Sequence, residues 1–255
     1  MTAVELLQPP GGIATLCTRD AAPTVWHNRE GMEHEIEPGL DVLKQRLLEM
    51  ASHAESAVNR AVQALTRRDY ELAVQVRDDD VILDRLEIEV DELAITLLAK
   101  APLASDLRLV TVAMKISQNL ERVGDEAAKV AKRARALSQE PPVKVAVDLP
   151  RMAGAALAML KAALDAFVNH DAAAARAVIP RDEAVDLLNK DIRRELVAFM
   201  TEHPDTIARC LDLLTAAKCL ERVADHATNI AEEVVFLCEA QDIRHQDKAA
   251  PVATA

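Results

Sequence analysis

Apolar residues recur along this chain at alternating spacings of three and four, which is the pattern of a helix with one buried face. The clearest run is formed by Leu40, Leu43, Leu47, Met50, Ala54, Ala57 and Ala61, and it predicts an amphipathic helix over residues 40–65. The same spacing, interrupted by residues that start or stop helices, predicts five more helices. Their ranges are about 70–100, 105–138, 149–169, 171–202 and 205–240.

Capping and breaking residues place the ends of several of these helices. Asp69 and Asp171 precede the second helix of each half and suit an N-cap, where a side-chain oxygen accepts a backbone N–H. Pro102 ends the second helix, and Ser105 or Asp106 can cap the third.

Segments outside the helical spacing divide the chain. Pro38-Gly39 marks the end of an N-terminal tail, and Pro141-Pro142 lies in a linker. The predicted division is a flexible tail over 1–36, a first bundle over 37–138, a linker over 139–147, a second bundle over 148–241 and a C-terminal tail over 242–255.

A twelve-residue pattern occurs twice, over residues 120–131 and 220–231, with seven identical positions at an offset of 100 residues. The preceding helices also match, because residues 69–86 correspond to 171–188 at an offset of 102. The chain therefore consists of two copies of one unit. Three long helices joined by short turns pack up-down-up. The sequence predicts an all-α fold of two tandem three-helix bundles, lying side by side or end to end.

Composition agrees with this fold class and limits the function. Half of the 255 residues are hydrophobic, only 2% are aromatic, and there are 6 glycines, which favours helix throughout. The formal net charge of −12 argues against a general nucleic-acid binder and against simple electrostatic binding to anionic lipid. The negative charge fits a soluble protein, a cation-binding protein or a partner for a basic surface.

Cysteine usage and the lack of targeting signals indicate the cytoplasm. Cys17, Cys210, Cys219 and Cys238 show no metal-binding or redox spacing, so we expect small buried residues in a reducing compartment. The N-terminus does not have the pattern of a secretory signal, and no segment has 18 uninterrupted apolar residues. We therefore expect no membrane-spanning segment.

Carboxylates four residues apart are the main candidate chemistry, because positions i and i+4 lie on one helix face. The four pairs are Asp80/Asp84, Glu121/Asp125, Asp182/Asp186 and Glu221/Asp225. Glu121 follows Met114 by seven residues, so it continues an apolar track. A half-buried carboxylate is costly unless it is paired or bound to a metal. The pairs therefore predict sites for hard or borderline cations such as Mg²⁺, Mn²⁺, iron or Ca²⁺.

Two other interpretations of these carboxylates remain open. They can form a salt-bridge network with nearby arginines, which are Arg85, Arg108, Arg122 and Arg222. They can also belong to a carboxylate-bridged metalloenzyme, although such bundles use Glu-x-x-His, and positions 124 and 224 are Gly and Ala. A further hypothesis is that the protein is a helical scaffold that binds no metal. We find no nucleophile–base arrangement and no phosphate-binding loop, so we expect no enzyme.

Neighbouring residues are weaker candidates. His226 follows Asp225 and is either a peripheral metal ligand or a surface or capped histidine. Glu87 and Asp91 continue the face of Asp84, where solvated helix surface is the default interpretation. Position 126 is Glu where position 226 is His, so the two predicted sites can differ in affinity.

Four segments resemble the PhoU family of phosphate-transport accessory proteins. They are Ala104–Leu109, Leu120–Asp125, Leu220–Ile230 and Gln241–His245, and the resemblance covers about residues 38 to 246. It implies a duplicated three-helix bundle with a repeated Glu/Asp-x-x-x-Asp motif. The N-terminal tail through about Gly31 lies outside the family pattern.

The resemblance implies regulation rather than catalysis. Family members restrain the high-affinity phosphate ABC transporter and hold the phosphate-sensing histidine kinase in its signal-off state when phosphate is plentiful. They bind iron or zinc clusters or other divalent cations, which implies Glu121, Asp125, Glu221 and Asp225 as ligands, with Asp80, Asp84, Asp182 and Asp186 from the partner helices. The expected partners are the transporter ATPase, the kinase and a second copy in a homodimer. We expect a cytoplasmic protein that reaches the inner membrane only through partners.

Overall fold

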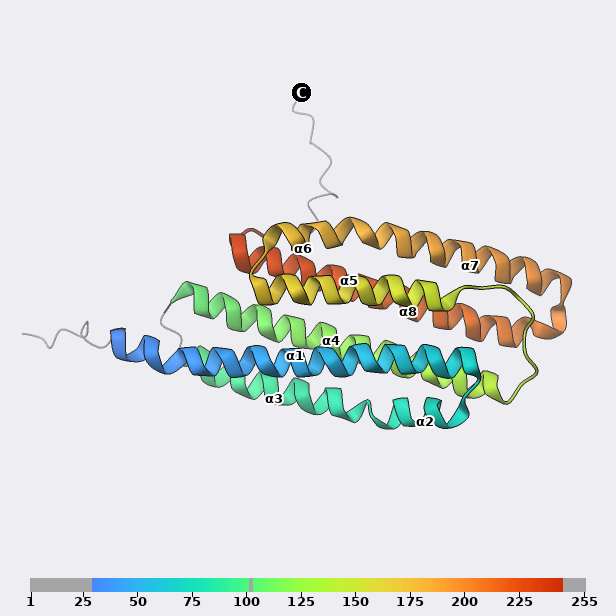
Figure 1. The fold of residues 1–255 in the computed structure, drawn as a ribbon, viewed down its shortest axis with the longest axis horizontal. Coiled ribbons are helices and arrows are strands. Elements are labelled where there is room, and N and C mark those ends of the chain that lie inside the picture. Colours follow the sequence, from blue (N-terminus) through green and yellow to red (C-terminus); the bar gives the residue numbers. More distant parts are fainter. Residues whose placement is uncertain (1–28, 101–102, 245–255) are drawn as a thin grey trace, which may run out of the picture.

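The computed structural model describes residues 29–100 and 103–244. Within these ranges the chain forms helices and connections, with no strand. The helices are α1 (Arg29–Arg67), α2 (Tyr70–Asp78), α3 (Val81–Leu98), α4 (Ala104–Ser138), α5 (Leu149–Asn169), α6 (Ala172–Val178), α7 (Asp182–Glu202) and α8 (Ile207–Glu239), with 3-10 turns η1 (Ile179–Arg181) and η2 (Pro204–Thr206) (Figure 1). The predicted all-α fold is confirmed.

The first helix begins earlier than the sequence predicted. Residues 29–36 are helical rather than part of a tail, while residues 1–28 and 245–255 of the two predicted tails lie outside the described residues. α1 runs through Pro38, although proline inside a helix costs about 3 kcal/mol. Ile36 is buried on the same face as Leu40, so core packing outweighs that cost. A Cβ on Gly39 would lie 2.6 Å from Leu97 Cδ2, so this glycine lets α3 approach α1 closely.

The second helix of each half is divided in two. Asp79 and Asp80 separate α2 from α3, and η1 separates α6 from α7. In the second half the cause is Pro180, which cannot donate to the helical ladder. In the first half three consecutive aspartates at 78–80 repel one another and favour helix poorly. Each break places an aspartate, Asp80 or Asp182, at the beginning of a new helix.

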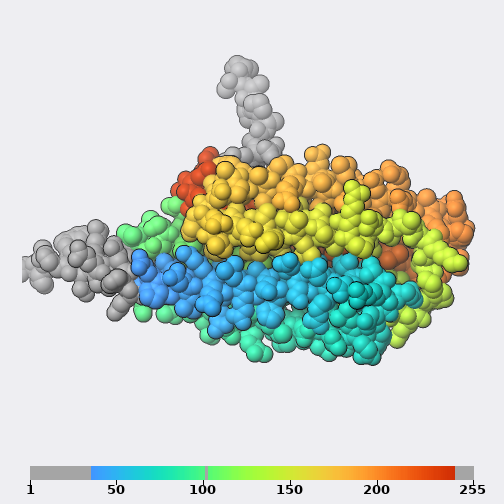
Figure 2. All heavy atoms as spheres, in the orientation of Figure 1, coloured from blue at the N-terminus to red at the C-terminus, as the bar shows by residue number. Residues whose placement is uncertain are grey.

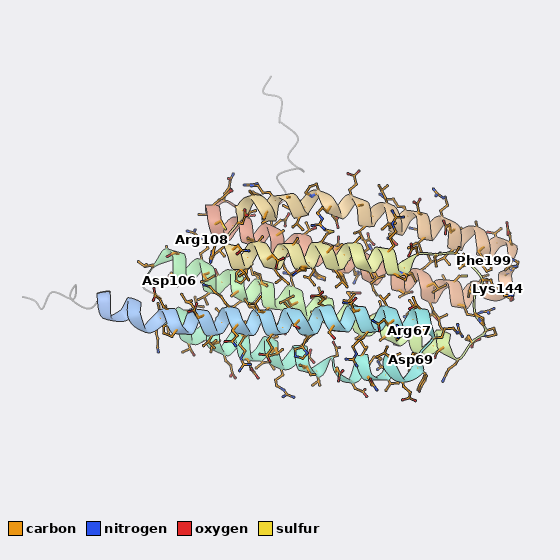
Figure 3. The ribbon with its side chains drawn as sticks, in the orientation of Figure 1. Arg67, Asp69, Asp106, Arg108, Lys144 and Phe199 are labelled. Atoms are coloured by element: carbon orange, nitrogen blue, oxygen red, sulfur yellow. The ribbon has the colours of Figure 1, made fainter. Side chains whose placement is uncertain are left out.

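Two of the predicted helix caps are present and one is absent. The N–H of Leu72 donates to Asp69 Oδ1 at 3.0 Å, and the N–H of Ala174 donates to Asp171 Oδ1 at 2.9 Å. Figure 3 shows Asp69 at the turn between α1 and α2. The predicted capping of α4 by Ser105 or Asp106 is wrong, because the helix begins earlier, at Ala104, with no side-chain cap.

The two bundles lie side by side, with α4 along α8 and α1 along α5 (Figure 1). α4 and α8 are antiparallel. Lys115 near the start of α4 pairs with Glu233 near the end of α8 at 2.9 Å, and Arg133 further along α4 pairs with Asp212 at 3.1 Å. We call the contact between α4 and α8 the seam.

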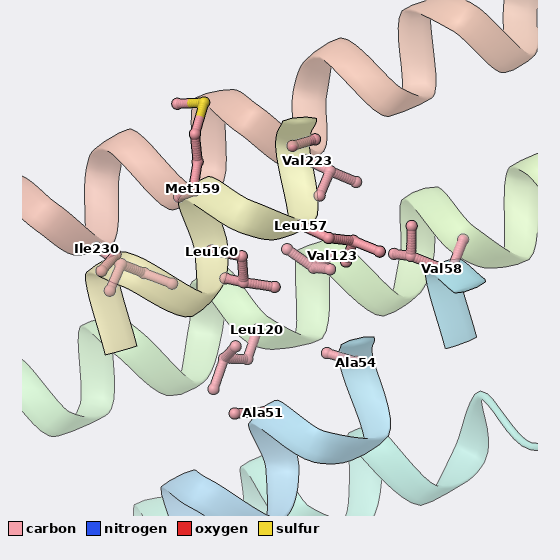
Figure 4. Close-up of a cluster of buried hydrophobic side chains, with 14 of the residues drawn as sticks. Ala51, Ala54, Val58, Leu120, Val123, Leu157, Met159, Leu160, Val223 and Ile230 are labelled. Carbon is pink, nitrogen blue, oxygen red and sulfur yellow. The ribbon is translucent and has the colours of Figure 1, made fainter. Parts of the chain in front are cut away.

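One core is shared between the bundles. Buried side chains from α1, α4, α5 and α8 meet in it, among them Ala54, Leu120, Leu160 and Ile230 (Figure 4). The space-filling view shows α1 and α5 packed side by side along one face of an elongated molecule (Figure 2). The two repeats therefore depend on each other for burial.

α5 is the one helix of the described chain that is long and apolar enough to cross a membrane. Its residues Met152, Leu160 and Phe167 are buried in the shared core. Packing within the bundle therefore accounts for its apolar character.

The cysteines of α8 agree with their predicted role. Cys210 and Cys219 are buried, Cys238 is half-buried, and all three are free thiols. Cys17 lies outside the described residues.

The linker passes over the end of the bundles and is held at its start by two arginines. Arg68 donates to the carbonyl of Glu140, and Arg209 donates to the carbonyl of Pro141 at 2.9 Å. These contacts fix the path of the chain between α4 and α5.

Candidate metal centre

The first candidate site lies between α3 and α4. Asp80 immediately precedes α3 and Asp84 lies in its first turn, while Glu121 and Asp125 occupy consecutive turns of α4. Gly124 makes their approach possible, because a Cβ at this position would collide with Leu83 and lie 3.3 Å from Asp80 Oδ1. The glycine of the repeated motif thus brings the α3 carboxylates up to those of α4.

The carboxylates of the first site lie close enough for their charges to affect the pKa values of Asp80 and Glu121. Burial raises the pKa of Asp80, and the charges of Asp125 and Asp84 raise it further, against the opposite effect of Lys129. Burial also raises the pKa of Glu121, again with Asp125 as the main repelling charge. The site therefore favours added positive charge.

The second candidate site lies between α7 and α8. Burial raises the pKa of Asp182 to about 6, and Asp225, Asp186 and Glu221 add to this rise in that order. Burial and the Glu221 charge also raise the pKa of Asp225. Asp182 Oδ1 is buried without a hydrogen-bond partner, which is costly unless a proton or cation is supplied.

Basic side chains already occupy part of both sites. Arg122 contacts Glu121 and Asp125, each at 3.2 Å. The salt-bridge interpretation is therefore correct for Arg122.

The second site has lysine and amide partners instead of an arginine bridge. Lys218 pairs with Glu221, Lys190 lies 3.9 Å from Asp186, and Asn189 donates to Glu221 at 2.9 Å. A metal ion would therefore compete with Arg122 at the first site and with Lys218 and Lys190 at the second.

The residues fit a metal by donor type but are not arranged around one point. Among the described residues, no group of three His, Cys, Asp or Glu side chains is placed to hold a metal ion. Carboxylate oxygens are the ligands that hard cations prefer, and the unpartnered Asp182 oxygen leaves one donor available. Side-chain rotation would have to complete any coordination shell.

Two residues extend the first site, contrary to their default interpretation as solvated surface. Glu87 and Asp91 are half-buried. Burial raises the pKa of Glu87, and Asp91 is the largest repelling charge on it. Asp91 Oδ1 is buried without a hydrogen-bond partner. In the second repeat their equivalents are Asn189 and Arg193, so the first site is the more acidic one.

The seam holds a buried carboxylate, Glu126, that the sequence distinguishes only by its difference from His226 at the matching repeat position. Glu126 is 3% exposed and contacts Lys129 at 2.9 Å and Arg222 at 3.3 Å. These partners, with the Cys219 thiol, lower the pKa of Glu126 against the opposing effect of burial. The difference between the repeats did not reveal the burial of Glu126, because that burial depends on how α8 packs against α4.

His226, the counterpart of Glu126, points to the seam. Its Nδ1 lies 3.0 Å from Asn119 Oδ1, and burial lowers the pKa of the imidazole. Because α4 and α8 are antiparallel copies, the 119–226 contact is repeated as a contact between positions 219 and 126, filled by Cys219 and Glu126. A structural role in the seam thus accounts for His226.

Comparison with known proteins agrees with this duplicated arrangement. The PhoU domain model matches residues 47–134 and again 149–234. A phosphate-specific transport system accessory protein PhoU homolog from Pseudomonas aeruginosa is 40% identical over 224 residues, covering 86% of this chain and 93% of that protein. The homolog from Rhizobium meliloti is 40% identical over 200 residues, covering 78% and 84%.

Solved structures show the same fold. The crystal structure of PhoU from Pseudomonas aeruginosa superposes with a TM-score of 0.77 at 40% identity, covering 80% of this chain and 99% of that one. The phosphate transport system regulatory protein PhoU from Streptococcus pneumoniae gives a TM-score of 0.75 at 28% identity, covering 83% and 99%. With both repeats matched by the family model, this chain belongs to the PhoU family.

Proposed function

We propose that this chain is a cytoplasmic negative regulator of phosphate uptake and of the phosphate-starvation response. In this role it is an adaptor between the ATPase of the phosphate ABC transporter and the phosphate-sensing histidine kinase. The main support is the match to phosphate-specific transport system accessory proteins over most of the chain. The duplicated helical scaffold offers two related surfaces, which suits a protein that contacts more than one partner.

We further propose that both carboxylate sites bind divalent or trivalent cations, with iron, zinc, Mg²⁺ or Mn²⁺ as candidates. Asp80, Asp84, Glu121 and Asp125 would hold one site, and Asp182, Asp186, Glu221 and Asp225 the other. Bound metal would supply positive charge that cancels carboxylate repulsion. The support is the raised pKa values of Asp80 and Asp182, each at a helix junction facing the motif pair of the next helix.

A regulatory role explains the sites better than catalysis does. In the first site, Arg122 forms ion pairs with Glu121 and Asp125. His226 is hydrogen-bonded to the side chain of Asn119. Cation binding would exchange these contacts for metal–oxygen bonds and so change the charge that a partner meets. In this proposal the protein is not an enzyme, and a homodimer is compatible with it.

The test is expression of a phosphate-starvation reporter, such as alkaline phosphatase, in a deletion strain grown in abundant phosphate. The proposal expects high expression that falls when the gene is supplied. Normal repression and normal phosphate uptake in the deletion strain would contradict the regulatory role. A variant with Glu221→Ala and Asp225→Ala then tests whether repression depends on the second carboxylate site.

A further inference from the structure

Three large apolar residues form an exposed row on the outer face of α3. Val81, Ile88 and Ile95 are 55%, 58% and 63% exposed. They are seven residues apart, so they stay on one side of the helix over a length of about 21 Å. The buried side of α3, which includes Leu86 and Val90, faces the opposite way. We call this row the α3 stripe.

An acidic row follows the α3 stripe along one side. Asp84, Glu87 and Asp91 are spaced by three and four residues and lie between the stripe and α4. α3 contains five acidic residues, Asp84, Glu87, Glu89, Asp91 and Glu92, against one basic residue, Arg85. The outer face of α3 is thus an apolar strip with a negative border.

The second repeat did not keep this surface, although it kept the core and the carboxylate pair. At the offset of 102, Val81 and Ile88 become Glu183 and Lys190, and only Ile95 keeps an apolar counterpart, Val197. The acidic border changes as well, since Glu87, Asp91 and Glu92 correspond to Asn189, Arg193 and Arg194. Folding of the repeat unit therefore does not require the α3 stripe.

Among the described residues, none covers the α3 stripe, whose three side chains are exposed. α3 lies along the lower edge of the molecule in Figure 1, packed against α1 and α4. Single exposed apolar residues are ordinary on a protein surface. A row at heptad spacing is instead the pattern with which one helix packs against another.

We propose that the α3 stripe and its acidic border are the docking surface for an amphipathic helix of a partner protein. That helix carries apolar residues about seven apart and lysines or arginines along one flank. Charge complementarity selects this occupant, because the acidic border repels acidic segments and anionic lipid headgroups. This inference rests on the adaptor role proposed above and assigns that role a surface on the first repeat.

Site-specific cross-linking in cells tests the location and the chemistry of the occupant. A photoreactive amino acid replaces Arg85, which borders the stripe, in the full-length protein, and its matched control replaces the equivalent residue Leu187 on α7. Mass spectrometry identifies the cross-linked peptide. The proposal expects a basic amphipathic segment of another protein from position 85, and not from position 187.

Three outcomes of this experiment overturn the proposal. They are a cross-link to a second copy of this chain, a cross-link to an acidic or uncharged segment, and no cross-link at position 85. The deletion strain separates this failure from failure of the regulatory role. Derepression in that strain without the expected cross-link overturns only the docking surface.

Binding of the identified peptide to the purified full-length protein gives a second test. Ile95→Lys should weaken binding about tenfold or more, since it removes buried apolar contact and adds a repelling charge. The matched variant Val197→Lys on α7 should change affinity less than about twofold, with circular dichroism confirming that both variants fold. Added salt should weaken binding of the wild type. Equal effects of the two variants, or binding insensitive to salt, would contradict the assignment.

Discussion

Arg222 of α8 lies 3.3 Å from Oε1 of Glu126 on α4, so a motif arginine of the second repeat pairs with a buried carboxylate of the first. Its counterpart Arg122 pairs instead with Glu121 and Asp125 on its own helix. The difference follows from one position, because the counterpart of Glu126 is His226. Two copies of one motif thus perform different tasks, one at the seam and one at the carboxylate site.

Replacing Arg222 should therefore destabilise the fold more than replacing a surface arginine. Arg222→Ala leaves Glu126 with Lys129 as its remaining basic partner, and we expect a loss of about 1–2 kcal/mol in the free energy of unfolding. Urea denaturation measures it. Arg194→Ala, which removes an exposed pair with Asp191, is the control and should cost less than about 0.5 kcal/mol. Equal losses would mean that the contact with Glu126 adds no stability.

Two helical glycines should respond to alanine in opposite directions. Gly154 has open space where a Cβ would lie, so Gly154→Ala should stabilise the protein by about 0.5–1 kcal/mol through helix propensity. At Gly124 the Cβ would collide with buried Leu83, and we expect a net loss of about 1–3 kcal/mol. Urea denaturation of both variants compares them directly. Stabilisation by Gly124→Ala would show that α3 can move away from α4 freely.

The repeat and the spacing of apolar residues were sufficient to predict the fold, because both reflect the burial of helix faces. The breaks before α3 and α7 were not predicted, because the apolar spacing continues through Leu83 and Val185. The early start of α1 was also missed, since core packing around Ile36 outweighs the effect of Pro38.

The carboxylate pairs were predictable because i and i+4 spacing is a local property of a helix. The basic side chains that pair with these carboxylates were harder to predict. Arg122 could be suspected from its place between Glu121 and Asp125, whereas the role of Glu126 depends on the packing of α8 against α4. The buried face of each helix can be predicted well from the sequence. The register between helices that are distant in the chain can be predicted only poorly.

Asp182→Asn should stabilise the metal-free protein. The raised pKa of Asp182 means that its charge is unfavourable in the folded state, and asparagine removes that charge. We expect a gain of about 1–2 kcal/mol at neutral pH, reduced from the full electrostatic penalty because the side chain is only half-buried. Thermal unfolding in EDTA measures it. A lower melting temperature would show that the carboxylate has a favourable partner in the folded state.

Metal removal should lower the stability of the wild-type chain if the proposed sites are occupied. A cation at one hundred times its Kd stabilises a protein by about 2.7 kcal/mol per site, so adding Mn²⁺ to EDTA-treated protein should raise the melting temperature. A variant combining Glu121→Gln, Asp125→Asn, Glu221→Gln and Asp225→Asn should not show this rise. A rise of the same size in that variant would place any bound Mn²⁺ elsewhere.

Arg122→Gln tests the competition between the arginine and a metal. The guanidinium contacts both motif carboxylates of the first site, so its removal should increase Mn²⁺ affinity severalfold. Isothermal titration calorimetry measures the affinity. Arg85→Gln, which removes a nearby exposed charge on α3, is the matched control for the general loss of positive charge. Equal effects of the two variants would rule out direct competition.

The pH dependence of the alkylation rate of Cys238 should show that the pKa of its thiol is raised. Burial raises the pKa of this thiol above the usual value near 9, and the charges of Glu239 and Asp171 add to the rise. Because the thiolate is the reactive form, the rate with iodoacetamide should increase about tenfold per pH unit up to pH 9 without levelling off. Mass spectrometry of the α8 peptide follows Cys238 separately from buried Cys210 and Cys219. A rate that already levels off near pH 9 would mean that the thiol ionises normally and that the end of α8 is more open to water than its packing indicates.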